Sequence, residues 1–229
     1  MSYFSGTRKP DFRNISSLDY DAYWRSRGFH LNETLKERET IIATLIPAGA
    51  SVLDVGCGNS LLPVVLRDKG CSVTVGDIST IVLAGYKQKG IKTLEVDLEN
   101  IREDFLFATY DYIILSEVLE HTRNPEEIIQ KLKKHTKHFV LTIPNSAFYR
   151  YRLHLVFQGR FFTQWVSHPS EHLRFWSHID FMDWIRDMGL VVDRAESSNG
   201  FSFFGLFPGL KNIWKNLFGH QIVYSVTCP

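Results

Sequence analysis

Short apolar runs alternate with amphipathic stretches along most of this chain, and turn-forming residues separate them. The runs have the length of buried strands and predict seven of them, at residues 52–55, 72–75, 92–96, 112–115, 139–143, 190–195 and 221–226. Apolar residues at helical spacing lie between the strands and predict helices at residues 32–46, 61–69, 80–89, from 125 onward, and 177–189. Alternation of this kind specifies an α/β fold with a doubly wound, mostly parallel seven-stranded sheet.

Two segments depart from this alternation. After the fifth strand the chain mixes aromatic, basic and histidine residues without a clean period. We therefore expect a single domain that spans residues 1–229, in which residues 145–176 form an inserted lid on the side where an acceptor substrate would bind. Residues 14–31 are expected to be an irregular lead-in to a helix that Asn32 caps.

Near the C-terminus, apolar residues repeat at helical spacing between residues 206 and 218, with Lys211 and Lys215 on the opposite side. We expect a helix whose apolar face packs on the core. The alternative is an interfacial helix that contacts lipid or a lipid-linked acceptor, which would give residues 206–218 a peripheral membrane contact.

Composition excludes several classes of protein. The chain has 229 residues, is 44% hydrophobic and 22% charged, and carries a net charge of +1, so electrostatics give no reason to expect a nucleic-acid partner. The three cysteines are scattered without the spacing of a metal site, which favours a reducing compartment. The first residues do not read as a signal sequence, and no apolar run has the length of a membrane span. We expect a cytoplasmic protein.

The end of the first strand carries the most informative motif. Asp54 follows the apolar run, and Gly56 and Gly58 follow the acid. Glycines in this position let the backbone turn tightly and approach a ligand. A dinucleotide-binding fingerprint would need a third glycine at the position of Leu61, so that class is excluded.

Three further strands end in the same way. Asp77 follows the second strand, Asp97 the third, and Glu117 the fourth. Because the carboxyl ends of parallel strands meet at one edge of the sheet, these carboxylates are expected to surround one ligand. The alternative for each acid is that it caps the helix or loop that follows.

The glycine pair with four successive acids resembles the class I S-adenosylmethionine (SAM) methyltransferases, over residues 30–145 and the closing strands. The resemblance implies that the glycine turn passes the amino-acid moiety of SAM, that Asp77 binds the ribose and that Asp97 binds the adenine. The cofactor-binding residues that it implies are Asp54, Gly56, Cys57, Gly58, Asp77, Ile78, Asp97, Leu98 and Ser116.

Beyond the fourth strand lies a second cluster, Glu117, Glu120 and His121, which one helical turn would place on one face. Two carboxylates and an imidazole suit a divalent cation such as Mg²⁺, Mn²⁺ or Zn²⁺, and His172 is the favoured fourth ligand. The pattern Glu-x-x-Glu-His is similar to that of ubiquinone-biosynthesis O-methyltransferases and small-RNA 2′-O-methyltransferases, where these positions bind metal. The alternative is a metal-free pocket in which His121 is the general base, with Glu117 beside it as a catalytic residue.

The segment after the fifth strand, with His172 to Phe175, resembles the methionine-biosynthesis MetW proteins and related methyltransferases encoded with cell-envelope glycan enzymes. We therefore expect a SAM-dependent methyltransferase that acts on an oxygen of a small-molecule or glycan-like acceptor. The alternative is a MetW-like, non-catalytic or regulatory partner of an acyltransferase in methionine biosynthesis.

Overall fold

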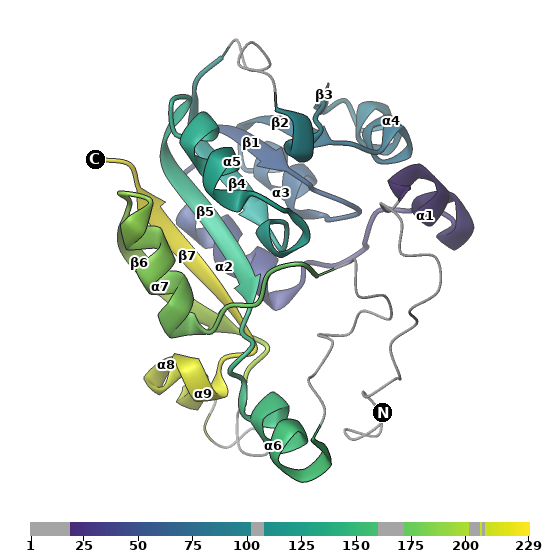
Figure 1. The fold of residues 1–229 in the computed structure, drawn as a ribbon. Helices are drawn as coiled ribbons and strands as arrows, with labels where there is room; N and C mark the ends of the chain where they lie inside the picture. The colour runs from purple at the N-terminus through teal and green to yellow at the C-terminus, as the bar shows by residue number, and fades with distance from the viewer. Residues whose placement is uncertain (1–18, 102–107, 160–171, 202–206, 208) are drawn as a thin grey trace.

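A seven-stranded sheet runs through the centre of the structure, a computed structural model that describes residues 19–101, 108–159, 172–201, 207 and 209–229 (Figure 1). The strands are β1 (Ser51–Val55), β2 (Ser72–Asp77), β3 (Lys92–Glu95), β4 (Tyr110–Ser116), β5 (Thr136–Pro144), β6 (Val191–Ser198) and β7 (Gln221–Thr227). They lie in the order β3-β2-β1-β4-β5-β7-β6, and β7 runs antiparallel to both of its neighbours. The predicted doubly wound, mostly parallel sheet of seven strands is confirmed.

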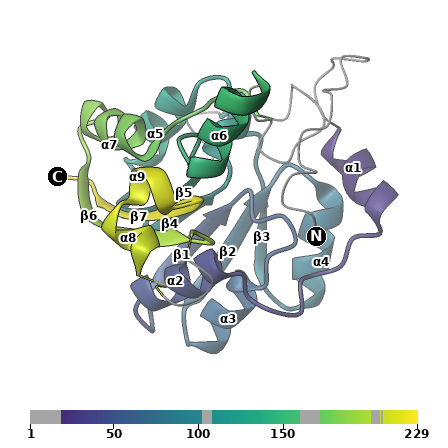
Figure 2. The same cartoon turned by 90° about the horizontal axis from the view of Figure 1, so that it is seen from below.

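Helices cover both faces of this sheet (Figures 1 and 2). They are α1 (Tyr20–Arg27), α2 (Glu37–Leu45), α3 (Leu62–Asp68), α4 (Thr80–Gln88), α5 (Pro125–Leu132), α6 (Tyr149–Gln158), α7 (His178–Asp187), α8 (Leu210–Ile213) and α9 (Lys215–Phe218), with short 3₁₀ turns η1 (Leu98–Asn100) and η2 (Leu119–His121). The α2, α3 and α4 helices pack on one face, and α5 and α7 on the other.

Alternating strand residues build the two halves of the core. In β1, Leu53 packs with the α5 and α7 side, whereas Val52 packs with the α2 and α3 side. Ile113 and Ile114 of β4 divide in the same way, and all four side chains are fully buried. Burial on both faces explains the continuous apolar runs of the sequence. Because β1 pairs in parallel with both β2 and β4, the carboxyl ends of these three strands lie side by side at one edge of the sheet.

Two expectations for the N-terminal region are wrong. The segment 14–31 contains the helix α1 rather than only irregular chain. The helix α2 begins well after Asn32, because the Glu39 carboxylate accepts the Lys36 backbone N–H (2.8 Å) and starts the helix there. Asn32 instead bonds Asn59 of the glycine loop, side chain to side chain and through its backbone N–H.

The expected lid is described only in part, because residues 160–171 lie outside the described residues. Within it, residues 149–158 form the regular helix α6, which the sequence did not predict. Only Tyr151 and His154 of this helix are buried. Two inward positions, one helical turn apart, give too weak a period to mark the helix in sequence.

The expected core-packed helix near the C-terminus is also wrong for the residues described. The chain forms two short helices, α8 and α9, which meet at Trp214 where the backbone leaves the helical region (φ −129°, ψ 73°). Neither helix buries a residue, and Ile213 is 80% exposed. Polar contacts hold the segment to β6 instead: Ser197 donates its N–H to the Asn212 side chain (2.8 Å) and its hydroxyl to the Lys211 carbonyl (2.7 Å).

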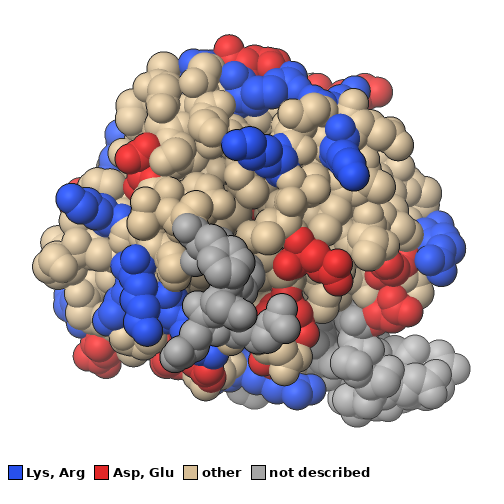
Figure 3. Space-filling view, turned by 90° about the horizontal axis from the view of Figure 1, so that it is seen from above, with Lys and Arg blue, Asp and Glu red and all other residues tan. Residues whose placement is uncertain are grey.

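Surface charge is mixed. On the face seen from above in Figure 3, Lys and Arg side chains alternate with Asp and Glu, in line with the net charge of +1. Among the described helices, none is both long and apolar enough to cross a membrane.

Candidate functional site

The glycine loop leaves β1 with two residues in the left-handed region. Gly56 has φ +70° and Gly58 has φ +52°, conformations that other residues rarely adopt. A Cβ on Gly56 would lie 2.6 Å from a methyl carbon of Val118, so the loop also passes too close to its neighbour for a side chain. The Gly56 N–H donates to the carbonyl of Gly76 at 2.7 Å, which ties the loop to β2. Gly56 and Gly58 of this loop line the space beyond the ends of the strands.

That space is a cavity of about 280 Å³ at the carboxyl ends of β1 to β4. Eight of the predicted site residues line it: Gly56, Gly58, Asp77, Ile78, Asp97, Leu98, Glu117 and His121. Three predicted cofactor residues, Asp54, Cys57 and Ser116, do not line the cavity. The side chain of Cys57, which lies between the two glycines of the loop, is buried, and the Ser116 hydroxyl is 3.0 Å from the Thr142 hydroxyl.

Asp77 stands at the centre of the cofactor side. Its carboxylate accepts the backbone N–H of Gly58 (3.1 Å) and of Ser79 (2.9 Å), and so joins the glycine loop to the start of α4. The side chain is 7% exposed, and burial raises its pKa above the ordinary value, against the effect of these hydrogen bonds. Asp77 is therefore held rigidly, with its charge incompletely compensated, at the wall of the cavity.

Asp97 combines both roles that its position allowed. Its carboxylate accepts the Glu99 N–H (2.9 Å) and the Asn100 amide (2.6 Å), so it caps η1 as an acid after a strand often does. The residue nevertheless lines the cavity beside Leu98. Capping therefore fixes the orientation of this wall.

Asp54 is 2% exposed and lies behind the glycine loop. Burial, followed by repulsion from Glu39 and Asp77, raises its pKa to about 8. The cation that acts against this rise is Arg38 of α2, and the same charge opposes the rise that burial causes in the pKa of Glu117. The Nε of Arg38 is buried without a hydrogen-bond partner among the described residues. Sequence reasoning missed Arg38, because a lone arginine in an amphipathic helix gives no signal of its own.

Glu117 is one of two non-glycine residues in the described chain with positive φ (58°). Its carboxylate accepts hydrogen bonds from Gln221 of β7 (2.7 Å) and Thr142 of β5 (3.3 Å). Burial raises its pKa. Strained backbone of this kind is concentrated at functional sites.

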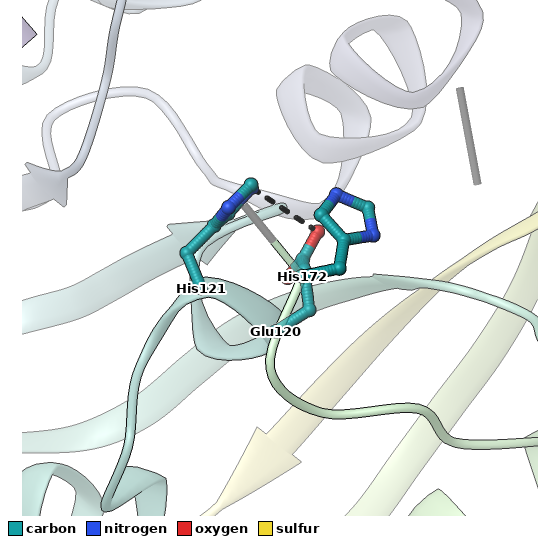
Figure 4. A group of neighbouring side chains, drawn as sticks. All are labelled: Glu120, His121 and His172. Carbon is teal, nitrogen blue, oxygen red and sulfur yellow. Dashed lines mark ion pairs between the residues drawn. The ribbon is translucent and has the colours of Figure 1, made fainter. Parts of the chain in front are cut away.

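The second cluster unites Glu120, His121 and His172, whose ligand atoms lie within 4.8 Å of one another (Figure 4). Glu117 is not part of this group of three. The Glu120 carboxylate is 1% exposed, and neither oxygen has a hydrogen-bond partner among the described residues. Burial, then repulsion from Glu117, raises its pKa well above the ordinary value.

His172 is distant from Glu120 in sequence, and backbone hydrogen bonds of the residues that follow it bring it into this cluster. The Glu120 carbonyl accepts the backbone N–H of Leu173 (2.7 Å) and of Arg174 (3.1 Å), which docks the segment on η2. The rings of His121 and His172 then meet edge to face, with centroids 4.7 Å apart. Burial lowers the pKa of His172 to about 3, so its imidazole is neutral and able to act as a ligand at neutral pH.

Sequence reasoning also missed the part of the cavity lining that α1 supplies through Tyr20, Tyr23 and Trp24. The signal was present, since aromatic residues at positions i, i+3 and i+4 share one face of a helix. It was overlooked because the segment precedes the regular strand–helix alternation.

Comparison with curated proteins gives two kinds of relative. The chain is 30% identical, over 70% of its length, to the bifunctional methionine biosynthesis protein MetXA/MetW of Rhodopirellula baltica, and covers 28% of that protein. It is 28% identical, over 72% of its length, to the ubiquinone biosynthesis O-methyltransferase of Rickettsia conorii, and covers 56% of it. The chain thus spans well under two thirds of each of these relatives.

Solved structures share the fold. The methyltransferase in complex with the Haloferax volcanii Trm112 activator has a TM-score of 0.61 at 18% identity, covering 92% of this chain and 96% of that one. Magnesium protoporphyrin IX methyltransferase from Synechocystis PCC 6803 with bound S-adenosylhomocysteine (SAH) has a TM-score of 0.57 at 16% identity, covering 84% and 80%. The expected class I methyltransferase fold is therefore confirmed.

The family assignment rests on a longer match. The family model for the methionine biosynthesis protein MetW matches residues 36–226, which includes the glycine loop, the acids after the strands and the Glu120–His121–His172 cluster. The resemblances drawn from the sequence, to MetW and to the ubiquinone-biosynthesis enzymes, are confirmed. The chain belongs to the MetW family.

Proposed function

We propose that this chain is a SAM-dependent methyltransferase that methylates an oxygen of a small-molecule or glycan-like acceptor. One observation carries the proposal: the glycine loop, Asp77 and His121 line one and the same cavity. A cofactor held by the glycine loop and Asp77 would present its methyl group toward His121.

The residues of the cavity fit the chemistry of SAM. Asp77 offers a carboxylate to the ribose hydroxyls, and Asp97 offers one to the adenine amino group. The exposed backbone of Gly56 and Gly58 suits the amino-acid moiety. SAM, when bound, supplies an electrophilic methyl group on a positively charged sulfur.

In methyl transfer the acceptor oxygen forms a bond to the methyl carbon as the carbon–sulfur bond breaks, and the hydroxyl loses its proton. His121 lines the cavity and is the group placed to accept that proton. Glu117, fixed by hydrogen bonds from Gln221 and Thr142, lines the same cavity. Holding the two reactants in line supplies much of the rate in such a displacement.

As the alternative to His121 acting as general base, we propose a divalent cation held by Glu120, His121 and His172. The fit is supported by the two Glu120 oxygens without a hydrogen-bond partner among the described residues and by the neutral His172 imidazole. One carboxylate and two imidazoles suit Zn²⁺ or Mn²⁺ better than Mg²⁺, which prefers oxygen ligands. A cation bound there would lower the pKa of an acceptor hydroxyl.

Methyl transfer should be measured as SAH release with a panel of hydroxylated acceptors, before and after treatment with a chelator. If the cation is required, chelation and Glu120→Ala both abolish SAH release, leave SAM affinity nearly unchanged, and metal analysis finds bound ion only in the wild type. Glu127→Ala, which removes an exposed carboxylate from α5, is the matched control for Glu120→Ala. Full activity of the metal-free protein would end the cation proposal. Loss of activity in His121→Ala, with activity kept in Glu120→Ala and after chelation, would support the general-base role.

Membership of the MetW family favours a second function, because the Rhodopirellula baltica relative is a bifunctional MetXA/MetW protein. In this alternative the chain is a non-catalytic or regulatory partner of an acyltransferase in methionine biosynthesis. Co-purification with the MetXA-type protein of the same genome tests it. An effect on that enzyme that persists in His121→Ala would support a regulatory role, and the absence of both complex and effect would exclude it.

A peripheral membrane contact is proposed for the described part of residues 206–218. The exposed side chains of Phe207, Ile213 and Trp214 support it. Flotation with vesicles of neutral and anionic lipid is the test, with the double variant Ile213→Ser/Trp214→Ser expected to reduce the bound fraction. Equal flotation of variant and wild type would contradict the contact.

A further inference from the structure

Residues 19–32, here called the N-terminal strap, are bonded both to the start of α4 and to the glycine loop and line part of the cavity. Figures 1 and 2 show α1, the helical part of the strap, beside α4 and outside the two helical layers of the sheet. The strap contributes nothing to the strand pairing of the fold. Its attachments are instead concentrated around the cofactor side of the cavity.

The first attachment is Asp21, which sits at the N-terminus of α4. Its carboxylate accepts the Ser79 hydroxyl (2.6 Å), the Thr80 hydroxyl (2.7 Å) and, more weakly, the Ile81 N–H (3.4 Å). Negative charge is favourable at a helix N-terminus. Ser79 also donates its backbone N–H to Asp77, so a single residue joins the strap to the carboxylate assigned to the ribose.

Two more attachments fix the other end of the strap. Phe29 packs into the space left by Gly85 of α4, where a Cβ would lie 2.3 Å from the phenyl ring. Asn32 donates its N–H to the Asn59 carbonyl (2.9 Å), and the two side-chain amides pair. The strap is therefore anchored both on α4 and on the glycine loop.

Beside the first anchor and between the anchors, the three aromatic residues Tyr20, Tyr23 and Trp24 line the cavity. Trp24 lies against Gly58, at 3.4 Å from the position of a Cβ on that glycine. Its ring also makes edge-to-face contacts with Tyr23 (centroids 5.2 Å apart) and Phe29 (5.4 Å). The aromatic wall is thus packed as one group that the anchors hold in place.

We propose, on the basis of the proposed SAM-binding function, that the N-terminal strap is the outer wall of the cofactor site, and that Asp21 is a positioning residue that holds it there. Tyr20, Tyr23 and Trp24 cover the bound cofactor on the side away from the sheet. Because these side chains line the cavity and Asp21 holds their helix on α4, Asp21 is released from α4 when the cofactor product leaves. Asp21 thereby affects both the affinity for SAH and the rate of its dissociation.

The test measures SAH binding by calorimetry and SAH dissociation by stopped-flow fluorescence. For Asp21→Ala and for Trp24→Ala we expect affinity lower by about tenfold and faster dissociation, since each removes contacts present only when the strap is closed. Thr80→Val, which removes one hydroxyl from the other side of the same contact, should give a smaller change in the same direction. Arg25→Ala, an exposed residue of α1, is the control and should bind as the wild type does.

A readout independent of affinity separates positioning from folding. Amide hydrogen exchange in residues 20–27 should slow when SAH binds the wild type, and should slow much less in Asp21→Ala, while the exchange of β1 and β4 stays the same in both proteins. Wild-type affinity and dissociation rate in both Asp21→Ala and Trp24→Ala would overturn the proposal. Failure of the wild type itself to bind SAH would instead refute the proposed cofactor.

Discussion

Replacement of Asp77 by alanine should weaken SAH binding by at least tenfold. The carboxylate is 7% exposed at the wall of the cavity, and hydrogen bonds from Gly58 and Ser79 hold it rigidly. A charge-assisted hydrogen bond contributes about 1.5–3 kcal/mol. Because about 1.4 kcal/mol corresponds to a factor of ten, loss of one ribose contact raises Kd by about tenfold to a hundredfold. Isothermal titration calorimetry measures the change directly.

The same substitution strips an acceptor from two backbone N–H groups, so its effect on folding must be measured separately. Each buried N–H left without a partner costs about 1–3 kcal/mol of unfolding free energy. Asp77→Asn keeps an acceptor oxygen for one of these two N–H groups and loses the charge, so in urea denaturation it should lose less stability than Asp77→Ala while still binding SAH weakly. Asp68→Ala, on the exposed end of α3, is the control. If both Asp77 variants bind SAH as the wild type does, Asp77 has no part in the cofactor site.

Three further predictions follow from local geometry. Gly56→Ala should abolish SAH binding and lower the melting temperature, because its Cβ would meet Val118 at 2.6 Å and its φ is +70°; normal binding would show that the loop tolerates a side chain. Hydrogen bonds from Ser79, then Thr80, hold the pKa of Asp21 below its ordinary 3.8, so the strap contact is complete above that pH and is lost as the pH falls through the lower, folded-state value. The protection of the α1 amides, measured relative to the intrinsic exchange rate at each pH, should therefore be lower at pH 3 than at pH 5, whereas equal protection at the two pH values would exclude the mechanism. Residues 145–176 should exchange faster than the sheet without ligand and slow when cofactor and acceptor bind, and slow, ligand-independent exchange would identify an ordinary structural insert.

The sheet was predictable from sequence because its signals are local and repeated. Buried strands such as β4 are continuous apolar runs, and each ends at a glycine, a proline or an acid that places the next turn. The acids could be assigned to one cavity from the order of strands along the chain, since parallel strands bring their carboxyl ends together. Asp77, Asp97 and Glu117 do line the same cavity.

The remaining parts of the site depend on contacts between distant residues, which no local pattern encodes. The docking of His172 on η2 depends on backbone hydrogen bonds to Glu120, and the buried position of Arg38 depends on how α2 packs. The C-terminal helices show the opposite failure. Their helical spacing was real, but Trp214 divides the segment, and polar bonds hold it to β6 while Ile213 and Trp214 stay exposed.

The most direct test of the central claim is a crystal structure of the wild-type protein grown with SAH. The account predicts density in the cavity between the glycine loop and α1, with the ribose hydroxyls on Asp77, the adenine beside Asp97 and Leu98, and the sulfur facing His121. An empty cavity at millimolar SAH, or SAH bound elsewhere on the chain, would contradict the assignment of this site to a SAM-dependent methyltransferase.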